Sequence, residues 1–215
     1  MINREKTNTT NQLPVFDMFY SIQGEGYNTG MAGYFIRLAG CNVGCKFCDE
    51  KMAWKTNDTL LQDVDTIIEK IKKENAQNVI ITGGEPTLYD LNNITKELHK
   101  ISKKTFLESS GVNKISGYWD WITLSPKQSL LPLESSLLLA DEIKVVIQKA
   151  EDFLFAEKML QVANNPILRH KPKTINYLQP EYTEKENILP LIIEYIKQNP
   201  TWRLSLQTHK MINIK

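Results

Sequence analysis

Residues 78–86 read NVIITGGEP, an apolar β-branched run that ends in a glycine-rich turn. Such a run predicts a strand that is buried on both faces, as in a parallel sheet. Similar stretches recur at 33–40, 105–109, 120–124, 142–147, 174–179 and 203–208. Between some of them, apolar residues repeat at every third or fourth position and predict helices at 59–74, 88–102, 151–164 and 186–198. Pro190 falls in the first turn of the last of these helices, where a missing N–H is tolerated.

The alternation of strands and helices predicts an α/β fold with a mostly parallel sheet and crossover helices. About seven strands are too few for a closed eight-stranded barrel, so we expect a partial, open β/α barrel, with a doubly wound sheet as the alternative. Both architectures bind ligands at the carboxyl ends of their strands. Polar motifs follow four of the predicted strands: TGGEP (82–86), ESSG (108–111), SPK (125–127) and LQPE (178–181).

Length and composition are those of an ordinary globular chain. The 215 residues suffice for one domain with a proper core, and 41% are hydrophobic and 24% charged. The net charge of +1 gives no broad electrostatic case for nucleic acid or membrane partners, and no apolar run is long enough to span a bilayer. The polar N-terminus lacks the apolar core of a secretion signal. We therefore expect a flexible tail at 1–13, a single domain at 14–215 and a cytoplasmic location.

All three cysteines of the chain, Cys41, Cys45 and Cys48, lie in the stretch CNVGCKFC (41–48). A disulfide would leave one thiol unpaired, and structural zinc needs a fourth ligand that no histidine supplies at local spacing. Unrelated buried thiols are a third alternative. Three thiolates suit a 4Fe–4S cluster, which four thiolates usually hold, because one iron stays open to an outside ligand. An open metal position is typical of a reactive site, so the stretch predicts a reactive iron–sulfur centre.

The CxxxCxxC spacing at the end of a strand resembles the signature of the radical S-adenosylmethionine (SAM) enzymes. The resemblance implies that the open iron binds SAM, whose reductive cleavage starts a hydrogen abstraction from the substrate. It also implies SAM contacts from the cysteine loop, from TGGEP and from the motifs that follow later strands. Glu85 would either offer its charge or fix the turn, and strand alternation favours Ser109 over Ser110. The implied SAM contacts are Phe47, Gly84, Glu85, Ser109, Ser125, Pro126, Lys127, Gln179, Pro180, Glu181 and Tyr182.

Three further stretches narrow the resemblance: FYSIQGEGYNTG (19–30), FIRLAGC (35–41) and RLSLQTHK (203–210). Together they resemble the 7-carboxy-7-deazaguanine synthase family over essentially 16–215. The resemblance implies conversion of 6-carboxy-5,6,7,8-tetrahydropterin to 7-carboxy-7-deazaguanine with loss of ammonia, on the route to queuosine and other 7-deazapurines. It also implies Mg²⁺, a homodimer and a flavodoxin-type electron donor. No residue stands out as an obligatory acid or base, although Glu108 and Lys127 are candidates.

The substrate's own chemistry points to particular side chains. The amide–amidine edge of a pterin needs paired acceptors and donors, which Gln23, Glu25 and the backbone of Ile22 and Gly24 offer. The carboxylate needs a cation, and Arg37 lies four residues before the cysteine loop. By resemblance, Thr82, His209 and the terminal carboxylate of Lys215 also reach the substrate.

The chain departs from the family pattern at one position. The family often has Thr or Ser two residues after the third cysteine, where the hydroxyl helps to hold Mg²⁺, and this chain has Glu50. A carboxylate can bind Mg²⁺ directly, or Glu50 can point outward and leave the metal to substrate and water. Two alternative functions also stay open, a radical SAM enzyme that activates a glycyl-radical partner and a zinc-stabilised binding module without redox activity.

Overall fold

The computed structural model describes residues 11–215, in which nine strands form one sheet in the order β3-β1-β2-β4-β5-β6-β7-β8-β9. β2 and β4 to β9 run parallel, whereas β1 is antiparallel to both β2 and β3. The strands are β1 (Gln12–Ile22), β2 (Ala32–Leu38), β3 (Leu61–Asp63), β4 (Asn78–Gly83), β5 (Lys104–Ser109), β6 (Trp121–Leu124), β7 (Glu142–Ile147), β8 (Ile175–Pro180) and β9 (Trp202–Leu204).

The strand order decides between the two predicted architectures. From β2 to β9 it rises without reversal, and β3 and β9 form the two edges of the sheet. A doubly wound sheet reverses its order at a switch point, and a closed barrel has no edges. The open, mostly parallel β/α barrel is therefore confirmed, and the doubly wound alternative is wrong.

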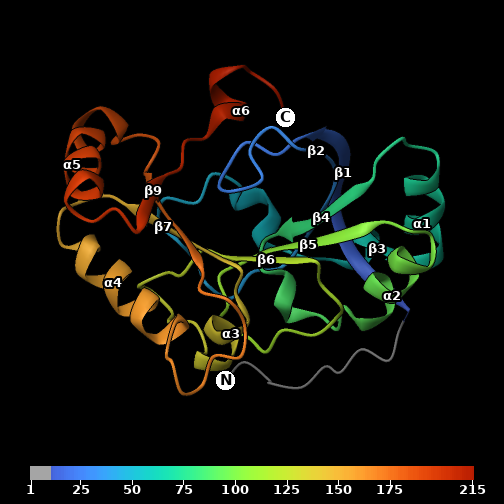
Figure 1. The fold of residues 1–215 in the computed structure, drawn as a ribbon. Coiled ribbons are helices and arrows are strands. Elements are labelled where there is room, and N and C mark those ends of the chain that lie inside the picture. Colours follow the sequence, from blue (N-terminus) through green and yellow to red (C-terminus); the bar gives the residue numbers. More distant parts are fainter. Residues whose placement is uncertain (1–10) are drawn as a thin grey trace.

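Helices α1, α2, α4 and α5 each bury an apolar side against the rest of the fold. In α1, for example, Val64, Ile67, Ile68 and Ile71 are buried and recur at helical spacing. Helices α1 and α2 lie toward one end of the sheet, and α4 and α5 lie toward the other (Figure 1). None of the helices within 11–215 has both the length and the apolar character that a transmembrane span needs. The α-helices are α1 (Val64–Lys72), α2 (Asn92–Lys100), α3 (Glu134–Leu139), α4 (Asp152–Ala163), α5 (Lys185–Gln198) and α6 (Thr208–Met211), and the 3₁₀ turns are η1 (Lys51–Trp54), η2 (Asp58–Leu60) and η3 (Pro86–Leu88).

Several local predictions need correction. The sequence did not predict β1, which contains Pro14 and an irregularity between Val15 and Asp17, or the short helices α3 and α6. The helix predicted at 59–74 is wrong over its first residues, because η2 and β3 precede α1, which begins at Val64. Because β1 begins at Gln12, two residues of the predicted tail belong to the sheet, while residues 1–10 lie outside the described part of the chain. Helix α5 begins at Lys185, so Pro190 lies inside the helix and not in its first turn.

Strand alternation separates the core from a polar face. Ile36, Ile81, Leu107 and Leu178 are fully buried in the hydrophobic core, and Val145 is buried there as well. Because side chains alternate across a strand, the residues next to them point to the opposite face. On that face lie Arg37, Thr82, Glu108, Lys144 and Gln179. The same alternation that builds the core therefore lines the concave side of the sheet with polar groups.

Candidate active site

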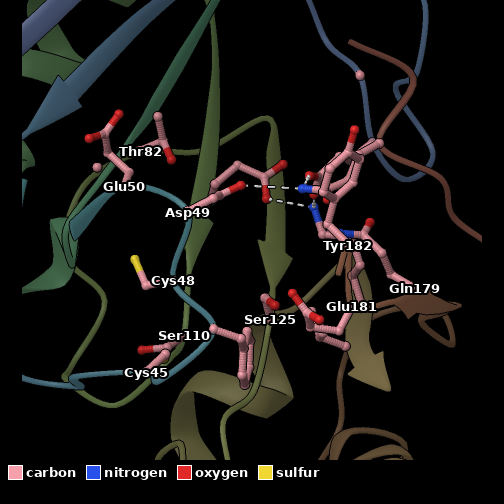
Figure 2. A pocket seen from close by; sticks show the side chains of 18 of the residues that line it. Cys45, Cys48, Asp49, Glu50, Thr82, Ser110, Ser125, Gln179, Glu181 and Tyr182 are labelled. Atoms are coloured by element: carbon pink, nitrogen blue, oxygen red, sulfur yellow. Dashed lines mark hydrogen bonds and ion pairs between the residues drawn. The ribbon is translucent and has the colours of Figure 1, made fainter. Parts of the chain in front are cut away.

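A cavity of about 860 Å³ lies at the carboxyl ends of the parallel strands. Figure 2 shows Cys45, Cys48, Asp49 and Glu50 on one side of it and Tyr182 across from them. Every predicted site residue lines this cavity except Pro126, which borders a neighbouring cavity of about 380 Å³ beside Cys45 and Lys127. The structure therefore brings together residues that lie up to nearly 200 positions apart in the sequence, from Ile22 to Lys215.

The cysteine loop follows β2, and its three cysteines line the cavity. Its three thiols are free and half-buried. The Val43 N–H donates to Cys41 Sγ at 3.5 Å, and the Trp54 indole N–H donates to Cys48 Sγ at 3.2 Å. Burial raises the pKa of the Cys45 thiol, while the Lys127 ammonium opposes that rise. The raised pKa favours the neutral thiol at Cys45 in the protein without a metal, whereas the N–H donors beside Cys41 and Cys48 suit sulfur atoms that act as ligands.

The donor set fits an iron–sulfur cluster better than a single zinc ion. Within the described residues, no three His, Cys, Asp or Glu side chains converge closely enough to hold one ion. A structural zinc site draws four such ligands to one point. The loop instead offers three separate unpaired thiols with N–H donors beside two of them, which suits a polynuclear cluster.

The glycine turn packs directly beneath this loop. A Cβ on Gly84 would lie 2.2 Å from the Gly40 carbonyl oxygen and 2.9 Å from that of Ala53. The Gly84 N–H donates to the Leu38 carbonyl, and the Glu85 N–H donates to that of Gly40. Glycine at position 84 is therefore needed for the turn to approach the cysteine loop.

Glu85 is buried and already saturated with protein hydrogen bonds. Its carboxylate accepts from the N–H and hydroxyl of Thr87, from the Ser109 hydroxyl, and from the N–H and hydroxyl of Ser110. These bonds tie the end of β4 to the end of β5. Of the two roles predicted for Glu85, fixing the turn is the one that these contacts support. Both serines bind Glu85, so the contacts do not separate Ser109 from Ser110.

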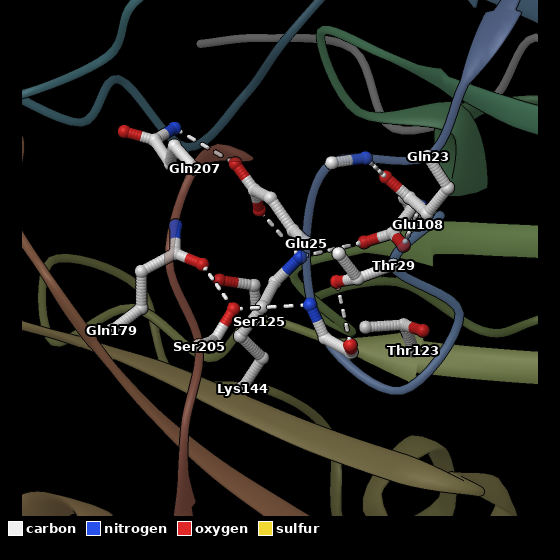
Figure 3. Close-up of polar contacts among 12 residues, drawn as sticks. Gln23, Glu25, Thr29, Glu108, Thr123, Ser125, Lys144, Gln179, Ser205 and Gln207 are labelled. Atoms are coloured by element: carbon white, nitrogen blue, oxygen red, sulfur yellow. Dashed lines mark hydrogen bonds and ion pairs between the residues drawn. The ribbon is translucent and has the colours of Figure 1, made fainter. Parts of the chain in front are cut away.

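A buried ion network occupies the centre of the concave face (Figure 3). Lys144 Nζ lies 2.6 Å from Glu25 Oε2 and 3.3 Å from Glu108 Oε2, and its side chain is 4% exposed. The Gln23 amide donates to Glu108, and the Gln207 amide donates to Glu25. These bonds connect the β1–β2 loop to β5, to β7 and to the C-terminal segment, which comprises residues 205–215 after β9.

Burial and charge set the ionisation of this network. Burial by itself would raise the pKa of Glu25, but Lys144 lowers it to about 2, so Glu25 is ionised at neutral pH. Glu108 is only partly compensated, and burial raises its pKa despite Lys144. Burial also lowers the pKa of Lys127, whose Nζ lies 5.8 Å from the centre of the Phe47 ring. The Lys144 ammonium therefore keeps Glu25 charged, whereas Glu108 is easier to protonate than an ordinary glutamate.

The C-terminal segment closes over the β1–β2 loop. The Thr208 N–H and hydroxyl both donate to the Gly24 carbonyl, at 2.9 and 3.0 Å. The His209 ring packs on Gly24 so closely that a Cβ there would lie 2.1 Å from His209 Nδ1. Burial lowers the pKa of His209, which favours the neutral imidazole. The Lys215 oxygen accepts a hydrogen bond from the Ser21 hydroxyl at 2.6 Å, which holds the chain end against the cavity.

Arg37 and Glu50 form an ion pair at the same cavity wall. Arg37 Nη1 lies 3.7 Å from Glu50 Oε2, and both side chains stay partly exposed. The Arg37 guanidinium also lies 6.0 Å from the centre of the Phe19 ring. Glu50 therefore points toward the cavity wall, next to the arginine that was predicted to bind a carboxylate.

Comparison with known proteins agrees with this geometry. The sequence profile of the radical SAM superfamily matches residues 35–125. The chain is 42% identical over 202 residues to the 7-carboxy-7-deazaguanine synthase of Flavobacterium psychrophilum, covering 94% of this chain and 92% of that one. It is 34% identical over 229 residues to that of Escherichia coli, covering 94% and 99%. The chain belongs to the 7-carboxy-7-deazaguanine synthase family. The crystal structure of QueE from Escherichia coli superposes with a TM-score of 0.81 at 30% identity, covering 91% of this chain and 94% of that one.

Several polar residues that line the cavity were not predicted from the sequence, among them Lys144, Asp49, Gln207 and Lys210. Lys144 lies within an apolar run, but alternation places it on the same face as Val146, which lines the cavity. Asp49 lies between two predicted residues, and its carboxylate accepts from Lys210 Nζ at 2.9 Å. Gln207 and Lys210 lie within the QTHK motif, in which His209 is the only predicted site residue.

Proposed function

We infer that this chain converts 6-carboxy-5,6,7,8-tetrahydropterin to 7-carboxy-7-deazaguanine with loss of ammonia, in 7-deazapurine biosynthesis. The observation that carries the inference is the shared cavity. The cysteine loop and the residues matched to the pterin line one space, in a chain whose relatives are named for this product. We also propose that residues 14–215 act as a single radical SAM domain.

The β1–β2 loop is proposed to bind the heterocycle. Gln23 and Glu25 both face the cavity and offer an amide and a carboxylate to the donor–acceptor edge of the pterin. Lys144 holds Glu25 ionised, and Gln207 donates to its other oxygen, so Glu25 is a fixed acceptor. A preorganised acceptor binds an amidine edge without the cost of ordering it first.

Arg37 is proposed to bind the substrate carboxylate, with Thr82 beside it. The two residues are partners in the β2–β4 ladder, so their side chains leave the same face of the sheet. In the free protein, Arg37 is paired with Glu50 at a distance longer than a normal hydrogen bond. A carboxylate ligand offers the guanidinium a closer, bidentate partner.

The three cysteines would hold a 4Fe–4S cluster, and SAM would lie between the cysteine loop and the ends of β5, β6 and β8. When bound, this pair supplies one-electron cleavage of SAM and the hydrogen abstraction that starts the ring contraction. The chain's own residues contribute position. Glu85 fixes the turn beneath the loop, and His209 and the C-terminal segment help to keep water from the substrate.

We propose that Mg²⁺ binds near Glu50 together with substrate and water oxygens. Mg²⁺ usually takes only one or two protein carboxylates, so Glu50 with substrate oxygens suffices. Movement of Glu50 toward the metal would also free Arg37 for the substrate. Activity titrated with Mg²⁺ tests this in the wild type, Glu50→Ala and Glu50→Gln. An unchanged Mg²⁺ dependence in both variants clears Glu50 of the role.

A flavodoxin-type electron donor and a homodimer are proposed on the basis of family resemblance. Lys46, Lys51 and Lys55 are exposed on and beside the cysteine loop, and such a basic surface suits an acidic donor protein. Salt-dependent reduction by flavodoxin tests the first proposal, and sedimentation equilibrium tests the second.

The function is tested by anaerobic incubation of the reconstituted protein with SAM, a reductant and the carboxypterin. We expect a product with the mass of 7-carboxy-7-deazaguanine and one ammonia per turnover. Arg37→Gln should raise the KM for the carboxypterin by about 10- to 100-fold, because a charge-assisted hydrogen bond is lost. The exposed Arg203→Gln serves as the matched control. A protein that binds its cluster and cleaves SAM but leaves the carboxypterin unchanged would contradict the proposed function.

A further inference from the structure

Trp54 touches the cysteine loop at two points. It is the last residue of η1, and its carbonyl oxygen accepts from the Cys41 N–H at 3.2 Å. Its indole N–H donates to Cys48 Sγ at 3.2 Å. One side chain and its own backbone therefore join the first and the last of the three cysteines.

The backbone around Trp54 is held from below. Ala53 is fully buried, and its carbonyl oxygen accepts from the Gly40 N–H at 2.8 Å. The turn at Gly84 packs against the same carbonyl, with no room for a side chain between them. The indole is thus attached to a fixed support, and its position relative to Cys48 does not depend on a mobile loop end.

The hydrogen bond has an electrostatic consequence for a bound cluster. Reduction adds one electron, supplied by dithionite in an assay, and breaks no bond. The added negative charge is shared with the thiolate ligands, and an N–H donor aimed at a thiolate sulfur stabilises it. The Trp54 contact to sulfur is shorter than the 3.5 Å contact from the Val43 N–H to Cys41.

We propose that Trp54 is a positioning residue that orients Cys48 and, through its indole N–H, raises the reduction potential of the bound cluster. This inference rests on the proposed function, since it requires the cluster. The effect makes the one-electron reduction that precedes substrate chemistry easier at a given donor potential.

The test measures the midpoint potential of the anaerobically reconstituted protein by a redox titration followed by electron paramagnetic resonance, without SAM or pterin. Trp54→Phe keeps an aromatic ring and removes the N–H. Replacement of Trp54 by 3-benzothienylalanine keeps the bicyclic shape and removes only the donor. Trp119→Phe is the matched control, because the Trp119 indole donates to the Ser116 carbonyl away from the cysteine loop.

We expect both Trp54 replacements to shift the midpoint potential to more negative values and Trp119→Phe to leave it unchanged. Wild-type potential in both Trp54 variants would overturn the inference. So would a shift confined to Trp54→Phe, which would indicate packing, or an equal shift in Trp119→Phe. If neither Trp54 variant takes up a cluster, Trp54 is needed to assemble the site, and the inference that it sets the reduction potential is overturned. A wild-type protein that takes up no cluster would instead refute the proposed function.

Discussion

Lys144→Met removes the charge at the centre of the buried network and keeps most of the side-chain volume. In the wild type, the Lys144 ammonium faces the carboxylates of Glu25 and Glu108, and all three side chains lie largely out of water. The substitution leaves two buried carboxylates without a counter-charge. Removing one partner of a buried ion pair lowers the free energy of unfolding, because water cannot solvate the charge that remains.

The magnitude follows from the ionisation of Glu25. Its pKa is about 2 in the folded protein, against 4.5 for an ordinary glutamate. That difference corresponds to about 3 kcal/mol of stability at neutral pH. Because the folded pKa is depressed, this stability is present above the unfolded pKa and is lost as the pH falls toward 2. Without Lys144, burial raises the pKa of both carboxyls, so the variant loses about 3–5 kcal/mol at neutral pH.

Urea unfolding of the protein without cofactors, followed by circular dichroism, measures this loss at neutral pH and at about pH 5. The loss should shrink at the lower pH, because protonated carboxyls are cheaper to bury. Lys197→Met is the control, since Lys197 forms an exposed pair with Glu194 at 2.8 Å and should lose less than about 0.5 kcal/mol. A loss in Lys144→Met below about 1 kcal/mol, or one that does not change with pH, would refute the reasoning.

Three further substitutions have defined outcomes. Gly24→Ala places a Cβ 2.1 Å from His209 Nδ1 and should raise the KM for the carboxypterin by about 10-fold, with little change in melting temperature. Gly83→Ala places a Cβ 2.1 Å from the Leu38 carbonyl oxygen at a φ of +140°, and urea unfolding should show a loss of about 3 kcal/mol or more. Burial raises the pKa of Glu142 to about 7, so wild-type stability falls as the pH rises from 4.5 through 7. Glu142→Gln should remove that fall, which amounts to at most about 3 kcal/mol in melting curves measured across pH.

Each of these outcomes has a control or a contrary result. Gly30→Ala also has a positive φ, but no heavy atom lies within 4 Å of the added Cβ, so it isolates backbone strain from the clash at Gly83. Equal losses in both variants would show that the close contact is not the cause. An unchanged KM in Gly24→Ala would show that the position of His209 does not matter for binding. Parallel pH curves for the wild type and Glu142→Gln would contradict the assigned protonation of Glu142.

The sequence alone determined the strands that form the parallel part of the sheet and the motifs at their carboxyl ends. Local composition carries this information, since buried parallel strands are continuous apolar runs and glycine turns follow them. The same local signals failed for β1, where Pro14 and Asp17 interrupt the apolar pattern, and for the three-residue strand β3. Nearly all the site residues predicted from these motifs line the cavity, although many of the other lining residues were not predicted.

Tertiary structure alone decided how those residues act on one another. In the sequence, Lys144 is one polar residue in an apolar strand. Only the folded structure shows that the β1–β2 loop brings Glu25 next to Lys144, which is its counter-charge. In the sequence, Glu85 is a residue of a glycine-rich turn, and only the structure shows that Ser109 and Ser110 donate hydrogen bonds to its carboxylate. The physical reason is that pKa values and hydrogen-bond saturation depend on distances and burial. Those quantities arise between segments that lie far apart in the chain, and no local pattern encodes them.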